Sequence, residues 1–187
     1  SADAVTLTGT VDGGFDLIIN TAADATVVTL TGAVGGGTPV DNINITGALV
    51  AGSTIVAESL TVSGTSSLTG NVTTDGATGQ AYTGLVTNAH ASKRTLTATA
   101  GDVNFGAGGY TGNTQDLDIA GDLDLDGAII ATKVFDVSGA ANLGANITTS
   151  DTITIDGATT LSANTTLTTS ADAVTLTGAV DLSLIHI

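Results

Sequence analysis

The fold is decided by the stretch from Val137 to Gly178, which reads VSGAANLGANITTSDTITIDGATTLSANTTLTTSADAVTLTG. When Gly139 is aligned with Gly157, the residues that follow the two glycines match, and the copies span 18 residues (Gly139 to Gly157) and 21 residues (Gly157 to Gly178). A shorter third copy begins at Gly64. Internal repeats of about 20 residues are typical of stacked architectures, in which each repeat forms one unit of a continuous core.

An asparagine stands seven residues after the first glycine of each copy, at Asn71, Asn146 and Asn164. Asparagine tolerates left-handed backbone angles, and its side chain can hydrogen-bond to its own turn. We therefore expect Asn146 and Asn164 to occupy equivalent turn positions on neighbouring repeats.

Each copy ends on the pattern apolar-x-apolar-x-Gly, which recurs along the chain at Gly9, Gly32, Gly47, Gly64, Gly121, Gly127, Gly139, Gly157 and Gly178. Two apolar side chains two residues apart share one face of a strand, and the residue between them points the other way. The pattern therefore predicts a short strand with one apolar and one polar face, followed by a glycine that lets the chain turn. The predicted interior residues are Val5, Leu7, Val28, Leu30, Ile43, Ile45, Leu60, Val62, Leu117, Ile119, Ile153, Ile155, Val174 and Leu176.

The composition favours a narrow interior. The 187-residue chain is 42% hydrophobic but only 3% aromatic, and it contains no Trp, Met or Cys. A β-sandwich of this size usually fills its thick core with aromatic side chains, whereas a solenoid needs small and β-branched ones. We predict an all-β fold, a right-handed parallel β-helix (β-solenoid) that forms a single stacked rod of about nine units of roughly 20 residues.

The repeat segment is expected to cover residues 1–181. The sequence SADAVTLTGTVD at residues 1–12 recurs as SADAVTLTGAVD at residues 170–181, so both ends of the segment carry the same repeat. The remaining residues 182–187, LSLIHI, break the pattern. We interpret them as a non-repeat tail that is not native.

Residues 75–95 are the main irregularity, because apolar and polar residues alternate only weakly there. They bring together Tyr82, His90, Lys93 and Arg94. The favoured interpretation is an insertion between repeats whose basic residues balance nearby acidic charge, since loops vary freely on repeat scaffolds. The alternative is a projecting loop in which these four residues bind a partner.

Aspartates alternate with leucine and isoleucine from residue 116 to residue 126. The segment DLDLDG, from Asp122 to Gly127, matches the start of a calcium-binding loop, but Lys133 occupies the twelfth position, where such a loop needs a bidentate glutamate. The favoured interpretation is two strands with aspartates on the polar face. The candidate calcium ligands are Asp116, Asp118, Asp122, Asp124 and Asp126.

The charge of the chain is strongly negative. Eighteen acidic residues face three Lys and Arg, which gives a net charge of −15. Nucleic acid is excluded as a partner because phosphate binding needs clustered Lys and Arg, and no apolar run has the length needed to insert into a membrane. The acidity is typical of a protein kept soluble by self-repulsion.

The tandem units V-T-L-T-G, I-T-I-D-G and A-N-I-T-T-S-D resemble the repeats of large bacterial surface exoproteins of the filamentous-haemagglutinin and autotransporter-adhesin type. The resemblance covers most of the chain outside residues 75–95 and 182–187. It implies a right-handed parallel β-helix, export to the bacterial surface or the extracellular space, and contact with surface glycans or proteins.

Three classes of function remain open. The leading one is a non-catalytic structural or adhesive stalk without a cofactor. The second is a polysaccharide-degrading β-helix enzyme, which needs converging carboxylates or a carboxylate with a base. The third is an ice-binding solenoid, suggested by Thr-x-Thr pairs at Thr6/Thr8, Thr29/Thr31 and Thr175/Thr177. A flat ice-binding surface needs such pairs on every repeat, and the outward pairs expected elsewhere contain aspartate.

Overall fold

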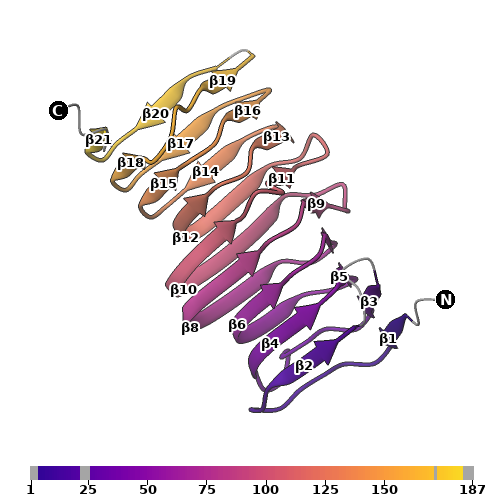
Figure 1. The fold of residues 1–187 in the computed structure, drawn as a ribbon. Helices are drawn as coiled ribbons and strands as arrows, with labels where there is room; N and C mark the ends of the chain where they lie inside the picture. The colour runs from indigo at the N-terminus through magenta and orange to yellow at the C-terminus, as the bar shows by residue number, and fades with distance from the viewer. Residues whose placement is uncertain (1–3, 22–25, 171, 183–187) are drawn as a thin grey trace.

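The computed structural model describes residues 4–21, 26–170 and 172–182, and this part of the chain consists of strands and their connections. Every strand pairing that it contains is parallel (Figure 1). The strands are β1 (Val5–Leu7), β2 (Leu17–Asn20), β3 (Val27–Leu30), β4 (Val40–Thr46), β5 (Ala48–Ala51), β6 (Ile55–Val62), β7 (Ser66–Leu68), β8 (Val72–Tyr82), β9 (Val86–Asn88), β10 (Arg94–Phe105), β11 (Tyr110–Thr111), β12 (Leu117–Leu125), β13 (Ile129–Thr132), β14 (Phe135–Val137), β15 (Ala141–Leu143), β16 (Ile147–Thr149), β17 (Ile153–Ile155), β18 (Thr159–Leu161), β19 (Leu167–Thr169), β20 (Val174–Leu176) and β21 (Val180–Leu182).

The chain winds into a β-solenoid of about nine coils, where a coil is one complete circuit of the chain. Each coil contributes one strand to a nine-stranded sheet, which we call face 1. The remaining strands form a 12-stranded sheet that bends along a corner, where the register of the long strands β8, β10 and β12 shifts. Beyond β12 the two halves separate, and β14 and β15 pair with different parts of β12. We call the first half face 2 and the second half face 3.

Three columns of inward side chains form the core, one on each face, and the register aligns them from coil to coil. On face 1 the column is Val5, Val28, Leu49, Ser66, Val86, Tyr110, Ile129, Ile147 and Leu167. On face 2 it is Val11, Val34, Ile55, Val72, Leu96, Ile119, Val137, Ile155 and Leu176. On face 3 it is Leu17, Ile43, Leu60, Gln80, Val103, Leu123, Ala141, Thr159 and Val180.

The predicted interior is confirmed in the middle of the rod and weaker at its ends. The predicted residues from Val28 to Ile155 are all buried. Val5, Leu7 and Leu176 are only partly buried against the core, and Val174 is 41% exposed. These four residues belong to the first and last described coils, which have a neighbouring coil on one side only.

Gly47 and Gly121, which end the repeat motif, have the positive φ expected of a turning glycine, but three other glycines of the motif have a different physical role. Gly139, Gly157 and Gly178 stack on one another at the corner between faces 2 and 3, and the amide of Gly157 donates to the carbonyl of Gly139 at 3.0 Å. A Cβ on Gly157 would lie 2.3 Å from the carbonyl carbon and oxygen of Gly139. These glycines therefore allow the backbones of adjacent coils to approach closely, and none of the three has a positive φ.

The middle of the rod is wider than the composition suggested. The step between paired residues on face 1 rises from 17 positions (Leu49 to Ser66) to 24 (Val86 to Tyr110). The longer coils enclose the rings of Tyr82, Phe105 and Tyr110, with centroid separations of 5.9 Å and 5.4 Å between successive rings.

The alignment of the asparagines is off by two residues. The register places Thr166, which precedes Leu167, over Asn146, and the Asn146 side chain accepts a hydrogen bond from the Thr166 amide at 2.8 Å. Asn164 lies in the connection between β18 and β19, which is two residues longer than the one between β15 and β16. The extra residues displace Asn164 from the stacked position.

Residues 75–95 do not form a separate insertion. They belong to β8, β9, the start of β10 and the connections between these strands, and β8 and β10 pair with each other and with β6 and β12. The irregularity is confined to the bulged corner around 75–79 and the loop at 89–93. At the other end, β21 extends to Leu182, one residue into the predicted tail, and residues 183–187 lie outside the described residues.

Candidate functional site

Many of the outward carboxylates and amides bond to the next coil. Six of these side chains accept a hydrogen bond from a backbone amide of the coil that follows, at donor–acceptor distances of 2.7 to 3.3 Å. They are Asp12, Asp16, Asn71, Asp116, Asp122 and Asn146. Each bond satisfies an amide at a corner, where the ladder of the sheet is interrupted. The polar faces of the repeats therefore contribute to stacking as well as to solubility.

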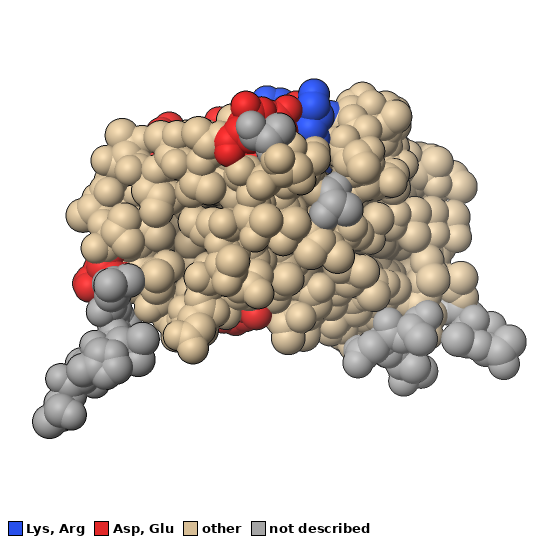
Figure 2. All heavy atoms as spheres, turned by 90° about the horizontal axis from the view of Figure 1, so that it is seen from above, with Lys and Arg blue, Asp and Glu red and all other residues tan. Residues whose placement is uncertain are grey.

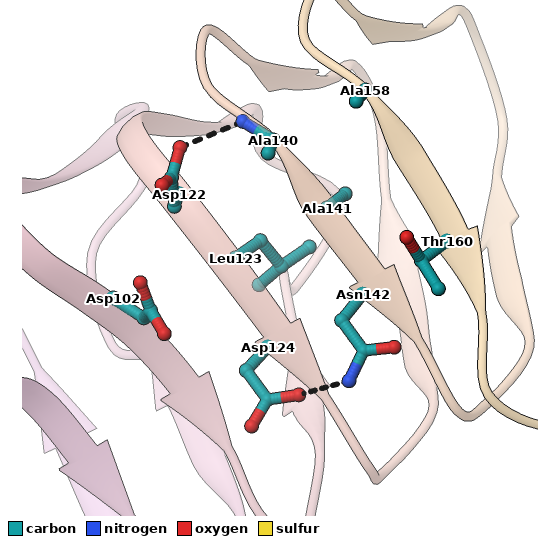
Figure 3. Close-up of a pocket in the computed structure, with 9 residues that line it drawn as sticks. All are labelled: Asp102, Asp122, Leu123, Asp124, Ala140, Ala141, Asn142, Ala158 and Thr160. Atoms are coloured by element: carbon teal, nitrogen blue, oxygen red, sulfur yellow. Dashed lines mark hydrogen bonds between the residues drawn. The ribbon is translucent and has the colours of Figure 1, made fainter. Parts of the chain in front are cut away.

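A hollow of about 310 Å³ lies on face 3 (Figure 3). Its acidic side is lined by Asp102, Asp122 and Asp124, and its floor includes the small side chains of Ala140 and Ala158. Because alanines replace the larger outward residues of neighbouring coils, the carboxylates stand at the margin of a shallow depression.

The carboxylate of Asp124 is held on both oxygens. Asn104 donates to one oxygen at 2.6 Å from the preceding coil, and Asn142 donates to the other at 2.9 Å from the following coil. The Asp124 side chain is therefore held in place by the coils on both sides of it.

The five candidate calcium ligands do not converge on one point. Asp116 and Asp118 lie on face 2 and Asp122 and Asp124 on face 3, because the strand bends at Gly121. In the described part of the chain, no group of three acidic or histidine side chains is placed to hold a metal ion. Alternation in β12 confirms the interpretation as strand, with Leu117, Ile119, Leu123 and Leu125 inward.

The four residues proposed to bind a partner are divided between the interior and the surface. Tyr82 and Arg94 are buried in the core, whereas His90 and Lys93 are exposed in the loop between β9 and β10. A contact surface made of all four therefore does not form. Only His90 and Lys93 remain available to a partner.

A polar cluster inside the rod was not found from the sequence. Gln80 is fully buried, donates to the carbonyl of Thr97 at 2.9 Å and accepts from the Tyr82 hydroxyl at 3.0 Å. The Arg94 guanidinium donates to the carbonyl of Thr69, while its Nε and the hydroxyl of Tyr110 have no hydrogen-bond partner. Burial lowers the pKa of Arg94 and raises the pKa of both tyrosines. A glutamine or arginine at an inward position interrupts the apolar alternation, and this interruption is the only feature of the sequence that could have indicated the buried polar cluster.

Carboxylates stack on face 2 next to one lysine. The register places Asp118 directly beside Asp136, and Lys93 forms an ion pair with Asp118 at 2.9 Å. Burial, followed by the negative charges of Asp118 and Asp156, raises the pKa of Asp136, and Lys93 acts in the opposite direction. The charge of Lys93 therefore offsets part of the repulsion between coils.

A second pair of carboxyl groups lies at the corner between faces 1 and 2 near the end of the rod. Asp151 follows β16, and Asp172 precedes β20 one coil later. A hydrogen bond from one carboxyl to the other, together with the negative charge of Asp151, raises the pKa of Asp172. The two residues are far apart in the sequence, so the pair becomes visible only once the coil length is known.

The outer surface of face 1 carries no charge. Its nine strands contain no acidic or basic residue. The central outward column is Thr6, Thr29, Val50, Ser67, Thr87, Thr111, Ile130, Thr148 and Thr168, with a register shift between the coils of Ile130 and Thr148. In Figure 2 charged side chains gather mainly along one margin of the face shown, and its broad middle has none.

Comparisons with known proteins return no relative. No family model, no curated protein and no solved structure matches this chain. Within the described residues, no helix is long and apolar enough to cross a membrane. The functional argument therefore depends on the geometry of the rod and of its surfaces.

Proposed function

We propose that this chain is a non-catalytic structural or adhesive stalk segment of an exported bacterial surface protein. The observation that carries the proposal is the use of the polar side chains. Six Asp and Asn residues at the corners bond to the backbone of the next coil, and Asp124 joins three coils through Asn104 and Asn142. Polar side chains that hydrogen-bond adjacent coils stabilise a long rod with a hydrated surface, which is what a spacer or adhesive stalk requires.

The surface supports this proposal over the enzyme. A glycosidase needs one carboxylic acid that stays protonated and a second carboxylate across the scissile bond. In the hollow on face 3, both oxygens of Asp124 already accept hydrogen bonds from side-chain amides of the adjacent coils. The carboxyls with raised pKa, Asp136 and Asp172, do not line that hollow. The features of a catalytic pair are therefore distributed over different places.

A panel of acidic and neutral polysaccharides tests the absence of catalysis. The purified chain is incubated with each polymer, with and without calcium, and new reducing ends are measured. We expect no turnover. Cleavage that disappears in Asp124→Asn or Asp172→Asn, but persists in the surface control Asp41→Asn, would overturn the stalk proposal and support the enzyme.

Ice binding is the second candidate, and the outer surface of face 1 favours it. Six of the nine central outward residues are threonine, and the strands of this face are free of charge. The Thr175/Thr177 pair used in the sequence argument lies on face 2 instead, because β20 pairs with β17. The threonines of face 1 are aligned across parallel strands, which are spaced about 4.8 Å apart.

Thermal hysteresis and ice recrystallisation distinguish this candidate from a stalk. A stalk leaves both unchanged. Ice binding predicts activity that is lost in Thr87→Lys, in the centre of face 1, and kept in Thr61→Lys, on the outer surface of face 3.

A further inference from the structure

Arg94 lies inside the rod although it is a charged residue. It is the first residue of β10, and only 5% of its surface is exposed. In the following coils its register partners are Leu117, Phe135 and Ile153, which are fully buried. Arg94 therefore occupies a position that the next coils fill with apolar side chains, and arginine is almost never buried unless it is paired.

The guanidinium of Arg94 has no acidic partner. An arginine side chain keeps its positive charge in proteins. In the part of the chain that the structure describes, the one ion pair joins Lys93 to Asp118, and the nearby Asp116 accepts a hydrogen bond from the backbone amide of Val134. A buried charge is normally compensated by an opposite charge, because taking an unpaired ion out of water is costly. None of the described carboxylates compensates the charge of Arg94 in this way.

Two hydrogen-bond donors at this place are also unsatisfied. The Nε of Arg94 and the hydroxyl of Tyr110 are both buried, and neither has a hydrogen-bond partner within the described residues. Burial raises the pKa of Tyr110 and the charge of Arg94 counteracts this effect, which requires the two side chains to lie near each other. The Nε group can only donate and the hydroxyl can donate as well. A single acceptor between them therefore satisfies both.

The acceptors of the buried polar cluster are already used by other donors. The carbonyl of Thr69 accepts from Nη1 of Arg94, and the side-chain oxygen of Gln80 accepts from the hydroxyl of Tyr82 at 3.0 Å. A water molecule satisfies the two free donors but leaves the positive charge of Arg94 uncompensated. An anion satisfies the donors and compensates the charge, and hydrogen bonds to an ionised partner are the stronger kind.

We propose that this chain binds one chloride ion inside the rod, between the guanidinium of Arg94 and the hydroxyl of Tyr110. The ion accepts hydrogen bonds from Nε and from the hydroxyl, and it compensates the charge of Arg94. One positive charge and two free donors match a small monovalent anion, whereas sulfate and phosphate carry more charge and need more donors. The site does not depend on whether the chain is a stalk, so the two proposals can fail separately.

Thermal unfolding of the full 187-residue chain, followed by circular dichroism, tests the proposal. Sodium gluconate replaces sodium chloride at constant ionic strength, so that the screening of the net charge of −15 stays the same. A ligand that binds only the folded chain raises the thermal midpoint as its concentration increases. We expect a rise of at least about 3 °C between chloride-free buffer and about 200 mM chloride. A midpoint that does not depend on chloride would overturn the proposal.

Three variants locate the effect of chloride. Arg94→Met removes the charge and keeps an unbranched side chain, and it should abolish the chloride dependence of the midpoint. Tyr110→Phe removes only the hydroxyl, so it tests the site even if Arg94→Met does not fold, and it should raise the chloride concentration for half of the effect at least threefold. The control Lys133→Met removes the same charge from an exposed residue and should keep the dependence of the parent. An unchanged dependence in Arg94→Met or Tyr110→Phe, or its loss in Lys133→Met, would contradict the proposed site.

Anomalous diffraction from crystals grown with bromide in place of chloride locates the ion directly. Bromide carries the same single charge, and we expect a peak beside Nε of Arg94 and the hydroxyl of Tyr110. The peak should be absent from crystals of Arg94→Met. Peaks confined to the surface of the rod would indicate an adventitious ion only, and they would refute an internal site.

Discussion

Phe105 offers the sharpest test of the interior, because the chain supplies its own control. The Phe105 side chain is fully buried and its ring lies 5.9 Å from Tyr82 and 5.4 Å from Tyr110, whereas Phe15 is 82% exposed. Replacing a buried Phe by Ala costs about 3–5 kcal/mol, and two aromatic contacts place Phe105→Ala in the upper half of that range. Phe15→Ala, the same chemical change, should stay within about 0.5 kcal/mol of the parent.

Urea unfolding followed by far-UV circular dichroism measures both variants. A loss of about 4 kcal/mol is a large part of the 5–15 kcal/mol that stabilises a typical domain. The midpoint of Phe105→Ala should therefore fall far below that of the parent and of Phe15→Ala. A difference of less than about 1 kcal/mol between the two variants would show that the aromatic cluster is not packed as described.

Three further changes test the stacking of the coils. Gly157→Ala should lower the free energy of unfolding by more than about 3 kcal/mol, because its Cβ would meet the backbone of the neighbouring coil. The control Gly9→Ala, which has nothing within 4 Å of its Cβ, should lower it by less than about 1 kcal/mol. Urea unfolding midpoints compare the two variants. Asn146→Ala should lose about 1 kcal/mol with its hydrogen bond to the next coil, and Asn164→Ala should lose nothing measurable in the same assay. The raised pKa of Asp136 means that the folded chain binds this proton more tightly than the unfolded chain, so stability falls as the pH rises from the unfolded-state pKa through the folded-state pKa. Asp136→Asn should flatten this part of the profile of thermal midpoint against pH, and an unchanged profile would contradict the described stacking of carboxylates.

The repeat pattern was sufficient to predict the solenoid and most of its core. Apolar residues two apart predicted inward pairs such as Ile43/Ile45 and Ile153/Ile155, which are buried as expected. The pattern works because one face of every strand must be apolar whatever its position along the rod. It fails at the ends, where Val174 has a coil on one side only.

The face on which a strand lies could not be predicted from its own sequence. The segment VTLTG occurs at residues 5–9 and at 174–178, yet the first copy forms β1 on face 1 and the second forms β20 on face 2. An identical strand fits either face because its inward residues are the same. Its place is set by the lengths of all the preceding connections, and errors in these lengths accumulate along the chain.

The candidate sites depended on the same lengths. Asp151 and Asp172 meet because one coil separates them, and the five aspartates from Asp116 to Asp126 separate because their strand crosses a corner at Gly121. Arg94 is buried although its sequence neighbourhood is that of an exposed loop. Neither a corner nor an inward arginine follows from local alternation, so the sequence grouped residues that the fold separates.

The central claim, that the coils stack in parallel at the described register, is tested most directly by a disulfide within one chain. Thr87 and Thr111 are paired on β9 and β11 of face 1, 24 positions apart in the sequence. Thr87→Cys combined with Thr111→Cys should oxidise to a monomer that has lost two hydrogens by intact mass, and the distant combination of Thr87→Cys with Thr168→Cys should stay reduced as a monomer. Failure of the first pair to oxidise in the folded chain, or equal oxidation of both pairs within the monomer, would contradict the solenoid and its register.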